Sequence, residues 1–346
     1  MKKSILVTMG DAAGIGPEII ARAFRDSPAD MAGCIVVGDV ATLRRAAALT
    51  AAAGPPAWPV AQLDSLTGAP EVLARCIPVL QKCELLAPAP FGLVSALAGK
   101  AAAECIVWAA RAVLAGEAAA MVTAPIHKEA LAAAGGWAAG FPGHTEMLQA
   151  EAAAFLGLAV SQVPVRMMLA NDELKTVLVS IHMSLRNAIE AVTFENVLQT
   201  LRITHGAVGA SLGRAPRIAV AGLNPHAGEG GLFGTEELTV IAPALAAARA
   251  EGLDVHGPFA PDTVFMRARN TPGKVGEFDV VVAMYHDQGL IPVKYLGVEQ
   301  GVNVTLGLPL VRTSPDHGTA FDIAGTGRAD ASSLVAAVRM ARRLAA

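Results

Sequence analysis

The feature that most constrains the fold of this chain is a repeated alternation of short apolar runs with longer segments of helical periodicity. The first apolar run, at 4–9, ends in a glycine-rich turn and is followed by a helical segment at 17–25, and the same succession returns along the chain. Buried strands that alternate with helices are typical of α/β proteins with a largely parallel sheet. The sequence therefore predicts an α/β fold.

Further elements are expected in order along the chain. Strands are predicted at 34–37, 119–124, 165–169, 176–181, 217–222, 280–284 and 302–305, and helices at 96–115, 146–155, 194–205, 236–251 and 331–344. The two strands on either side of Asn171-Asp172 are expected to form a hairpin. The segment 50–70 is expected to be a loop or a weak edge region. The segment 313–325 is expected to be a polar loop with little regular structure, and loops of that length are often functional.

The chain is longer than one hydrophobic core usually serves. Its 346 residues exceed the roughly 250–300 residues at which single cores stop growing, so we expect two domains or one large composite. Hydrophobic residues make up 53% of the chain and charged residues only 16%, whereas soluble domains carry about 25% charged residues. This shortage of charge indicates that part of the surface is buried against another subunit.

Charge and composition exclude several classes of protein. A net charge of -3 and an aromatic content of 4% offer neither the basic stripe nor the stacking platform of a nucleic-acid-binding protein. No membrane span is expected, because the longest charge-free stretch near the N-terminus, 46–63, contains Pro55-Pro56. The apolar run after Lys3 is interrupted by Asp11, which makes it too short for a signal peptide.

The cysteines indicate the compartment. They lie on apolar segments without CxxC spacing, at Cys34, Cys76, Cys83 and Cys105. Free cysteines of this kind are usually buried, and they persist as thiols in a reducing compartment. We therefore expect a cytoplasmic protein.

Half of the eight histidines follow directly after predicted strands. They are His127, His182, His226 and His286. Any one of them alone is more simply explained as a strand cap, but four at this kind of position indicate a ligand site, because ligands bind beyond the carboxyl ends of the strands in open α/β sheets. No HExxH motif occurs, so a metal would need ligands from distant segments, and neutral imidazoles would suit a divalent Lewis acid.

Two turns have the position of anion-binding sites. The loop Gly10–Gly16 joins a strand to a helix but matches neither a dinucleotide-binding nor a P-loop motif, and Asp11 disfavours a bare phosphate there; by itself the loop is more simply a structural turn. His144 and Thr145 begin a helix and can donate to a phosphate. No GxSxG motif occurs, which disfavours nucleophilic hydrolysis.

Taken together, the motifs resemble one enzyme family across nearly the whole chain. They read MGDAAGIGPEI at 9–19, TAPIHKEAL at 123–131, FPGHTEML at 141–148, GLNPHAGEGGLFGTEE at 222–237, PDTVF at 261–265, YHDQGLIPVKYLG at 285–297 and the block at 303–325. This set is similar to the 4-hydroxythreonine-4-phosphate dehydrogenase family of pyridoxal phosphate biosynthesis and its close paralogues.

The resemblance implies a two-domain fold like that of isocitrate and isopropylmalate dehydrogenases, with α/β/α layers. Residues 1–135 with 304–346 would form a terminal domain on the cofactor side. Residues 136–303 would form a central domain that carries the metal ligands and the dimer contact. The family's site lies at a homodimer interface and is shared between subunits, so a homodimer is expected here.

The resemblance also implies the roles of particular residues. A divalent metal (zinc, magnesium or cobalt) would be bound by His182, His226 and His286. The phosphorylated substrate would be bound by His144, Thr145, Lys294, Asn303 and Arg312, and the catalytic groups would be Lys294, Asp262 and Asp287. NAD or NADP would be bound through a loop that includes His317, Gly318, Thr319 and Asp322. The roles of His127, Lys128 and the loop Gly10–Gly16 stay open.

The implied reaction is the metal-dependent oxidation of 4-phosphohydroxy-L-threonine by NAD, with decarboxylation to 3-amino-2-oxopropyl phosphate. Lys294 is the expected proton carrier. The sequence departs from the family where Ala12 replaces a common proline and at Met183–Arg186. These departures keep open a paralogue acting on 4-phospho-threonate or 4-phospho-erythronate. Two other classes also stay open: a metal-dependent phosphate-ester hydrolase and a non-catalytic phosphometabolite-binding protein.

Overall fold

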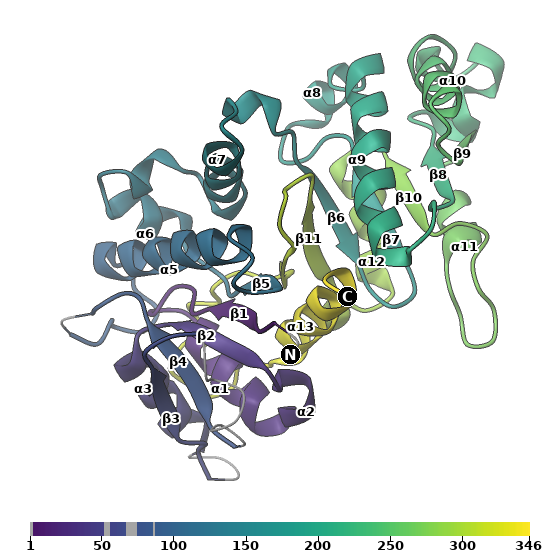
Figure 1. The fold of residues 1–346 in the computed structure, drawn as a ribbon. Coiled ribbons are helices and arrows are strands. Elements are labelled where there is room, and N and C mark those ends of the chain that lie inside the picture. The colour runs from purple at the N-terminus through teal and green to yellow at the C-terminus, as the bar shows by residue number, and fades with distance from the viewer. Residues whose placement is uncertain (1–2, 52–55, 67–74, 86) are drawn as a thin grey trace. The chain divides into compact units, whose positions relative to one another are not determined.

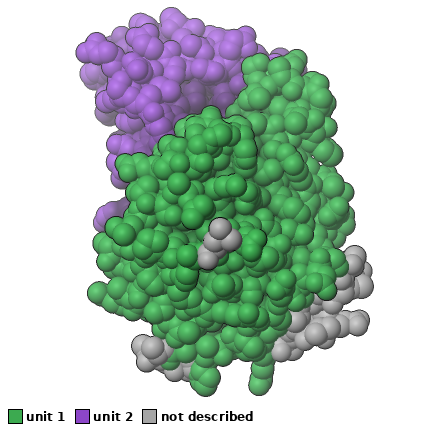
Figure 2. Space-filling model, turned by 90° about the vertical axis from the view of Figure 1, so that its left-hand side faces the viewer, with its two compact units in different colours: residues 1–164, 308–346 green, residues 165–307 purple. Residues whose placement is uncertain are grey.

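The computed structural model describes residues 3–51, 56–66, 75–85 and 87–346. The chain divides into two compact units, shown in Figure 2: unit 1 is Met1–Pro164 with Leu308–Ala346, and unit 2 is Val165–Gly307. The sequence-based prediction instead places residues 136–164 in the central domain, whereas the structure has them in unit 1. In unit 1 this segment includes α7 (His144–Leu156), which packs against α5 (Ala96–Leu114) of the same unit.

Unit 1 is built on a parallel sheet. Its strands follow the order β3 (Val60–Leu63), β4 (Ile77–Gln81), β2 (Cys34–Gly38), β1 (Ile5–Thr8), β5 (Ala120–Thr123) and β12 (Arg312–Pro315). Every pairing among them is parallel. Every residue of β1, β2 and β5 is buried, as the continuous apolar runs predict for a sheet covered on both faces.

Helices cover the two faces of this sheet (Figure 1). On one face α5 packs on β1, β2 and β5 and contacts α6 (Lys128–Ala133) and α7. On the other, α13 (Ser332–Leu344) packs on β1, β5 and β12 and contacts α1 (Gly16–Asp26), which contacts α3 (Val40–Ala51). The short elements of this unit are α2 (Pro28–Met31), η1 (Ala138–Gly140) and η2 (Val160–Gln162).

Unit 2 has a mixed sheet. Its strands follow the order β11 (Val302–Leu306), β6 (Arg166–Ala170), β7 (Lys175–Leu178), β10 (Val280–Ala283), β8 (Ile218–Ala221) and β9 (Val255–Phe259). The pairs β11/β6 and β6/β7 are antiparallel, which confirms the predicted hairpin, and the pairs from β7 to β9 are parallel. The core of this unit includes Leu169, Leu178, Val281 and Val293.

The helices of unit 2 complete its layers. They are α8 (Leu185–Glu190), α9 (Phe194–Leu212), η3 (Pro225–Gly231), η4 (Glu237–Ile241), α10 (Ala242–Ala250), α11 (Val264–Ala268), α12 (His286–Tyr295) and η5 (Val298–Gln300). Helix α9 packs on β7, β10 and β11, while α12 packs on β6, β7 and β10. Thus α12, which begins with His286, lies directly against β7 and β10, the strands that precede His182 and His286.

Of the two predictions about irregular segments, one needs correction. The segment 50–70 contains the edge strand β3, in agreement with the predicted weak edge region, and its residues 52–55 and 67–70 lie outside the described residues. The expectation that 313–325 lacks regular structure is wrong for its first residues, because β12 extends to Pro315. The polar side chains there are buried rather than solvated: Thr313 Oγ1 donates to the carbonyl of Ala337, at 2.8 Å.

Two sequence expectations are met by the part of the chain that the structure describes. All four cysteines are free and buried. Among the described helices, none is both long enough and apolar enough to cross a membrane.

Candidate active site

The turn after β1 is fitted closely to the end of β5. Gly10 has φ +73°, and a Cβ on it would lie 2.5 Å from the carbonyl oxygen of Pro125, so only glycine fits at this position. The next residue, Asp11, donates its backbone N–H to the same carbonyl, at 2.9 Å. The carboxyl ends of β1 and β5 are therefore fixed against each other.

Asp11 itself is fully buried at this edge of the sheet. Its Oδ1 accepts from the backbone N–H of Ala13, at 2.8 Å, but Oδ2 has no hydrogen-bond partner among the described residues. Burial raises the pKa of Asp11, and the hydrogen bond from Ala13 and the nearby His127 oppose this shift. A buried carboxyl group here supports the expectation that the loop Gly10–Gly16 does not bind a bare phosphate.

His127 follows β5 and contacts the loop after β12. Its ring stacks on Phe321, with the ring centroids 4.5 Å apart and the planes inclined by 15°. Its Nδ1 is buried and has no hydrogen-bond partner within the described ranges, whereas the neighbouring Lys128 is exposed. His127 therefore joins the turn after β5 to the predicted cofactor loop.

The predicted phosphate ligands His144 and Arg312 lie together in unit 1. Only 4% of Arg312 is exposed, and burial lowers its pKa to about 10, so it stays a cation at neutral pH. Its Nε and Nη2 donate to Thr123 Oγ1, at 3.1 and 2.8 Å. A buried guanidinium that stays charged can bind an anion such as a phosphate through charge-assisted hydrogen bonds.

His144 begins α7, with Thr145 half-buried beside it. Burial lowers the pKa of His144 well below its ordinary value, the charge of Arg312 lowers it further, and a hydrogen bond to the backbone of Ala124 opposes the shift. Its Nε2 is buried and has no hydrogen-bond partner among the described residues. The helix N-terminus, the imidazole and the guanidinium form a site suited to a phosphate monoester.

The other two predicted substrate ligands belong to unit 2. Lys294 is half-buried in the last turn of α12, and Asn303 is half-buried in β11, opposite Leu169 of β6. Neither one is among the described residues that line the two cavities with the predicted metal ligands, which are presented below. Their approach to the phosphate stays a prediction.

The three predicted metal ligands follow neighbouring parallel strands of unit 2. His182 comes after β7, His286 after β10 and His226 after β8, and β10 lies between the other two strands. The rings of His182 and His286 are adjacent, with centroids 5.6 Å apart and planes inclined by 45°. They line a cavity of about 470 Å³ together with Ser180, Tyr285 and Asp287.

His226 lies in a different hollow. It lines a cavity of about 640 Å³ together with Asp262, Tyr285 and Asp287, so Asp287 and Tyr285 border both hollows. From His226 to Gly230 every residue has a positive φ, and the side chain of His226 is 66% exposed. Left-handed backbone at non-glycine residues is costly and often occurs at functional sites.

The predicted cofactor loop is anchored on the first motif. His317, Gly318 and Asp322 are exposed, while Thr319 is buried and its carbonyl accepts from the backbone N–H of Ile15, at 3.0 Å. A Cβ on Gly14 would lie 2.9 Å from Thr319 Cβ, so these two loops are in close contact. The loop Gly10–Gly16 is therefore the support of the 317–322 segment.

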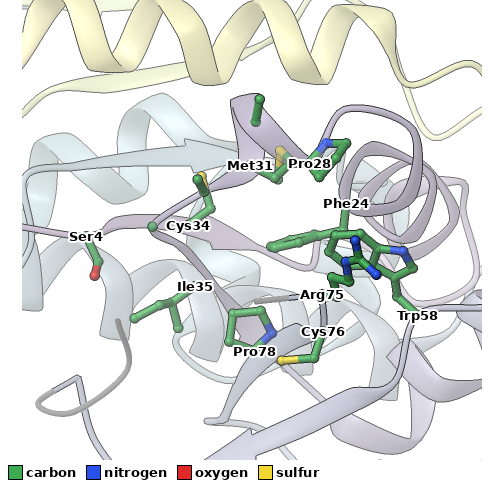
Figure 3. Close-up of a pocket in the computed structure, with 13 residues that line it drawn as sticks. Ser4, Phe24, Pro28, Met31, Cys34, Ile35, Trp58, Arg75, Cys76 and Pro78 are labelled. Carbon is green, nitrogen blue, oxygen red and sulfur yellow. The ribbon is translucent and has the colours of Figure 1, made fainter. Parts of the chain in front are cut away.

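The opposite edge of the unit 1 sheet differs in character (Figure 3). A cavity of about 440 Å³ there is lined mainly by apolar groups, among them Phe24, Met31, Ile35 and Trp58, with Arg75. None of the predicted site residues is among its described lining residues. By contrast, the unsatisfied polar atoms of Asp11, His127 and His144 lie near the carboxyl ends of β1 and β5.

Comparison with known proteins identifies the family. Residues 30–341 match the model of the family described as pyridoxal phosphate biosynthetic protein PdxA. The chain belongs to this family. A 4-hydroxythreonine-4-phosphate dehydrogenase from Beijerinckia indica is 52% identical over 344 residues, which cover 98% of this chain and 94% of that protein.

Two further relatives extend this comparison. A D-threonate 4-phosphate dehydrogenase from Pectobacterium atrosepticum is 42% identical, with all of both chains covered (100% each). The crystal structure of a 4-hydroxythreonine-4-phosphate dehydrogenase from Klebsiella pneumoniae superposes with a TM-score of 0.86 at 41% identity, and covers 100% of both chains. The predicted family, the predicted fold class and the prediction of an oxidoreductase acting on a CH–OH group are confirmed.

Membership of the PdxA family implies a nicotinamide cofactor and a metal, and the side chains of unit 2 fit the metal in part. His286 Nδ1 lies 2.7 Å from Asp287 Oδ1. A carboxylate only accepts hydrogen bonds, so the proton lies on Nδ1 and the lone pair of Nε2 is left for a metal, as in many metal-bound histidines. Among the described residues, however, no three His, Cys, Asp or Glu side chains are grouped closely enough to hold a metal. One chain thus supplies a pair of imidazoles.

Proposed function

We propose that the protein is a divalent-metal-dependent dehydrogenase that uses NAD, or NADP, to oxidise 4-phosphohydroxy-L-threonine and decarboxylates the product to 3-amino-2-oxopropyl phosphate. The observation that carries this proposal is the buried cationic site of Arg312 and His144 at the start of α7. Such a site suits the phosphate that both kinds of named relative have on their substrates. The relative at 52% identity carries the amino-acid substrate in its name, which favours this substrate over the threonate.

In this proposal the phosphate is bound by Arg312, His144 and Thr145, with Lys294 and Asn303 completing the contacts. A bound dianion next to His144 opposes the effect of Arg312 and raises the pKa of the imidazole, which can then donate to a phosphate oxygen. Lys294 carries a proton to or from the reacting carbons.

We further propose that the metal, zinc, magnesium or cobalt, is bound by His182, His226 and His286, in a homodimer whose active site is shared between subunits. His182 and His286 come from one chain, because their rings are adjacent, and His226, which lies in another hollow, comes from the second chain. Asp287 orients His286, and Asp262 provides a second carboxylate in the hollow of His226. The bound metal would polarise the substrate hydroxyl and the carbonyl that replaces it.

The nicotinamide cofactor is proposed to bind at His317, Gly318, Thr319 and Asp322. Its role would be to accept a hydride from the substrate carbon. The exposed side chains of His317 and Asp322 on a backbone fixed at Thr319 support this assignment. The buried free thiols support a reducing location, which we propose to be the cytoplasm.

The second candidate is a paralogue that oxidises 4-phospho-threonate or 4-phospho-erythronate. The name of the relative from Pectobacterium atrosepticum favours it. A phosphate-ester hydrolase using the same histidines is the candidate from another class.

A substrate panel separates these candidates. The purified protein is supplied with NAD, each metal in turn, and 4-phosphohydroxythreonine, 4-phosphothreonate or 4-phosphoerythronate. We expect NADH absorbance to rise fastest with 4-phosphohydroxythreonine. A faster rise with a phosphorylated hydroxy acid that lacks the amino group would assign the paralogue. Release of inorganic phosphate without NAD, and no NADH with any of the acids, would contradict the dehydrogenase.

A further inference from the structure

The buried carboxylate of Glu18 supports the far end of the segment that begins as the proposed cofactor loop. Glu18 lies in the first turn of α1, and only 1% of it is exposed. Its Oε1 accepts from the backbone N–H of Gly325, and its Oε2 accepts from that of Gly327, at 3.0 Å. Both glycines have positive φ, +81° and +67°, so the backbone turns here in a conformation that side chains disfavour.

Arg22 completes this support one helical turn further along α1. Its Nη2 donates to the carbonyl oxygen of Gly327, at 2.5 Å. Residues four apart on a helix project from the same face, so Glu18 and Arg22 together bind the donor and the acceptor of the same residue. The backbone at Gly327 is therefore held by two charge-assisted hydrogen bonds.

The same segment is packed from other directions. Ile15 holds Thr319, and His127 stacks on Phe321. The ring of Phe91 lies directly against Gly325, with the guanidinium of Arg45 4.0 Å from its ring centroid. The segment from 319 to 327 is thus fixed at its two ends and in the middle, while His317 and Asp322 stay exposed.

We propose that Glu18 is a positioning residue for the nicotinamide cofactor: by fixing Gly325 and Gly327 it preorganises the loop 317–322, and Arg22 acts with it. This inference rests on the proposed function, in which that loop binds the cofactor. A loop that is already ordered loses less conformational freedom on binding, so its affinity is higher. Burying a carboxylate costs free energy even when it accepts two backbone hydrogen bonds. A functional role for the loop that it fixes explains why this arrangement is present.

The test compares Glu18→Gln with the wild type. The glutamine keeps the size of the side chain, but its NH2 group faces a backbone donor and breaks one of the two hydrogen bonds. We expect the dissociation constant of NAD, measured by calorimetry on the metal-loaded protein, to rise about tenfold, which corresponds to roughly 1.4 kcal/mol. The dissociation constant of inorganic phosphate at the His144–Arg312 site should stay unchanged. Asp26→Asn, which alters an exposed carboxylate on the same helix, is the matched control and should change neither constant.

The outcomes separate the inference from the proposed function. If the wild type does not bind NAD, the proposed function fails. If the wild type binds NAD and Glu18→Gln binds it equally well, or if NAD and phosphate weaken to the same extent, the positioning role is wrong. Should Glu18→Gln fail to fold, Arg22→Ala and Arg22→Lys take its place. The alanine should weaken NAD binding and the lysine, which can still donate to Gly327, should restore part of it; equal affinities in both would contradict the inference.

Discussion

The two units carry histidines in opposite environments. In unit 1, His144 has a buried Nε2 and lies beside an arginine that is only 4% exposed. In unit 2 the side chain of His226 is 66% exposed and that of His286 is 38% exposed, in open hollows. The buried site of His144 and Arg312 is formed within one chain. His226 and His286 of unit 2 are exposed to solvent, and among the described residues they do not belong to a group of three metal ligands. This difference supports our proposal that one chain binds the phosphate and that a second copy completes the metal site.

The largest expected effect comes from the buried site. Arg312→Met should remove the cation while keeping the apolar part of the side chain. We expect kcat/KM for the phosphorylated substrate to fall by a factor of about thirty to several thousand, from roughly 2–5 kcal/mol for a buried charged contact. Steady-state kinetics measures this. Arg44→Met, which removes an exposed arginine of α3, should leave kcat/KM unchanged, and an equal loss in both variants would contradict the assignment.

Substitutions in the cavity lined by His182 and His286 should change the amount of metal that the protein binds. His286→Ala removes one of the adjacent imidazoles, so we expect the bound metal per chain to fall at least about tenfold in equilibrium dialysis. Asp287→Asn should keep the ligand but weaken its orientation, with a loss of about 10- to 100-fold in metal affinity. Phosphate binding at Arg312 should be unaffected by either change. Full metal occupancy in His286→Ala would show that this histidine is not a ligand.

The smallest effect concerns the pH dependence of stability. Folding lowers the pKa of His144, so the folded state resists protonation and the unfolded state takes up the proton first. Stability is therefore unaffected by this group above the ordinary histidine pKa of about 6.5 and falls as the pH drops below it, by at most about 1.4 kcal/mol per pH unit. Urea unfolding at about pH 7.5 and about pH 5.5 should show a smaller loss in His144→Asn than in the wild type. An equal loss in the two proteins would contradict a buried neutral imidazole.

Much of the fold was predictable because it depends on local pattern. Continuous apolar runs predict strands such as β1, β5 and β10, and the turn residues Asn171-Asp172 predict the hairpin of β6 and β7. The start of β12 was missed because its polar side chains are satisfied by distant partners, such as Ala337 for Thr313. No local pattern contains such a contact.

The candidate site was likewise predictable only in part. The position of histidines after strands was visible in the sequence, but the adjacency of His182 and His286 depends on β7 pairing with β10, which the order of the chain does not give. Acidic residues are common in the first turn of a helix, so this position alone does not single out Glu18. Its place among the apolar residues on the buried face of α1 was the signal that could have identified it.

Mixed dimers test the central claim most directly, since they ask whether one chain's histidine pair is completed by another chain. The inactive variants His226→Ala and His286→Ala are co-expressed with different tags, the mixed dimer is isolated, and NADH formation is measured. The account predicts recovered activity, because one of the sites then combines an intact His182–His286 pair with an intact His226. Mixed dimers of His182→Ala with His286→Ala should stay inactive, because each pair lacks one ring. No recovery in the first mixture, or equal recovery in both, would contradict the account.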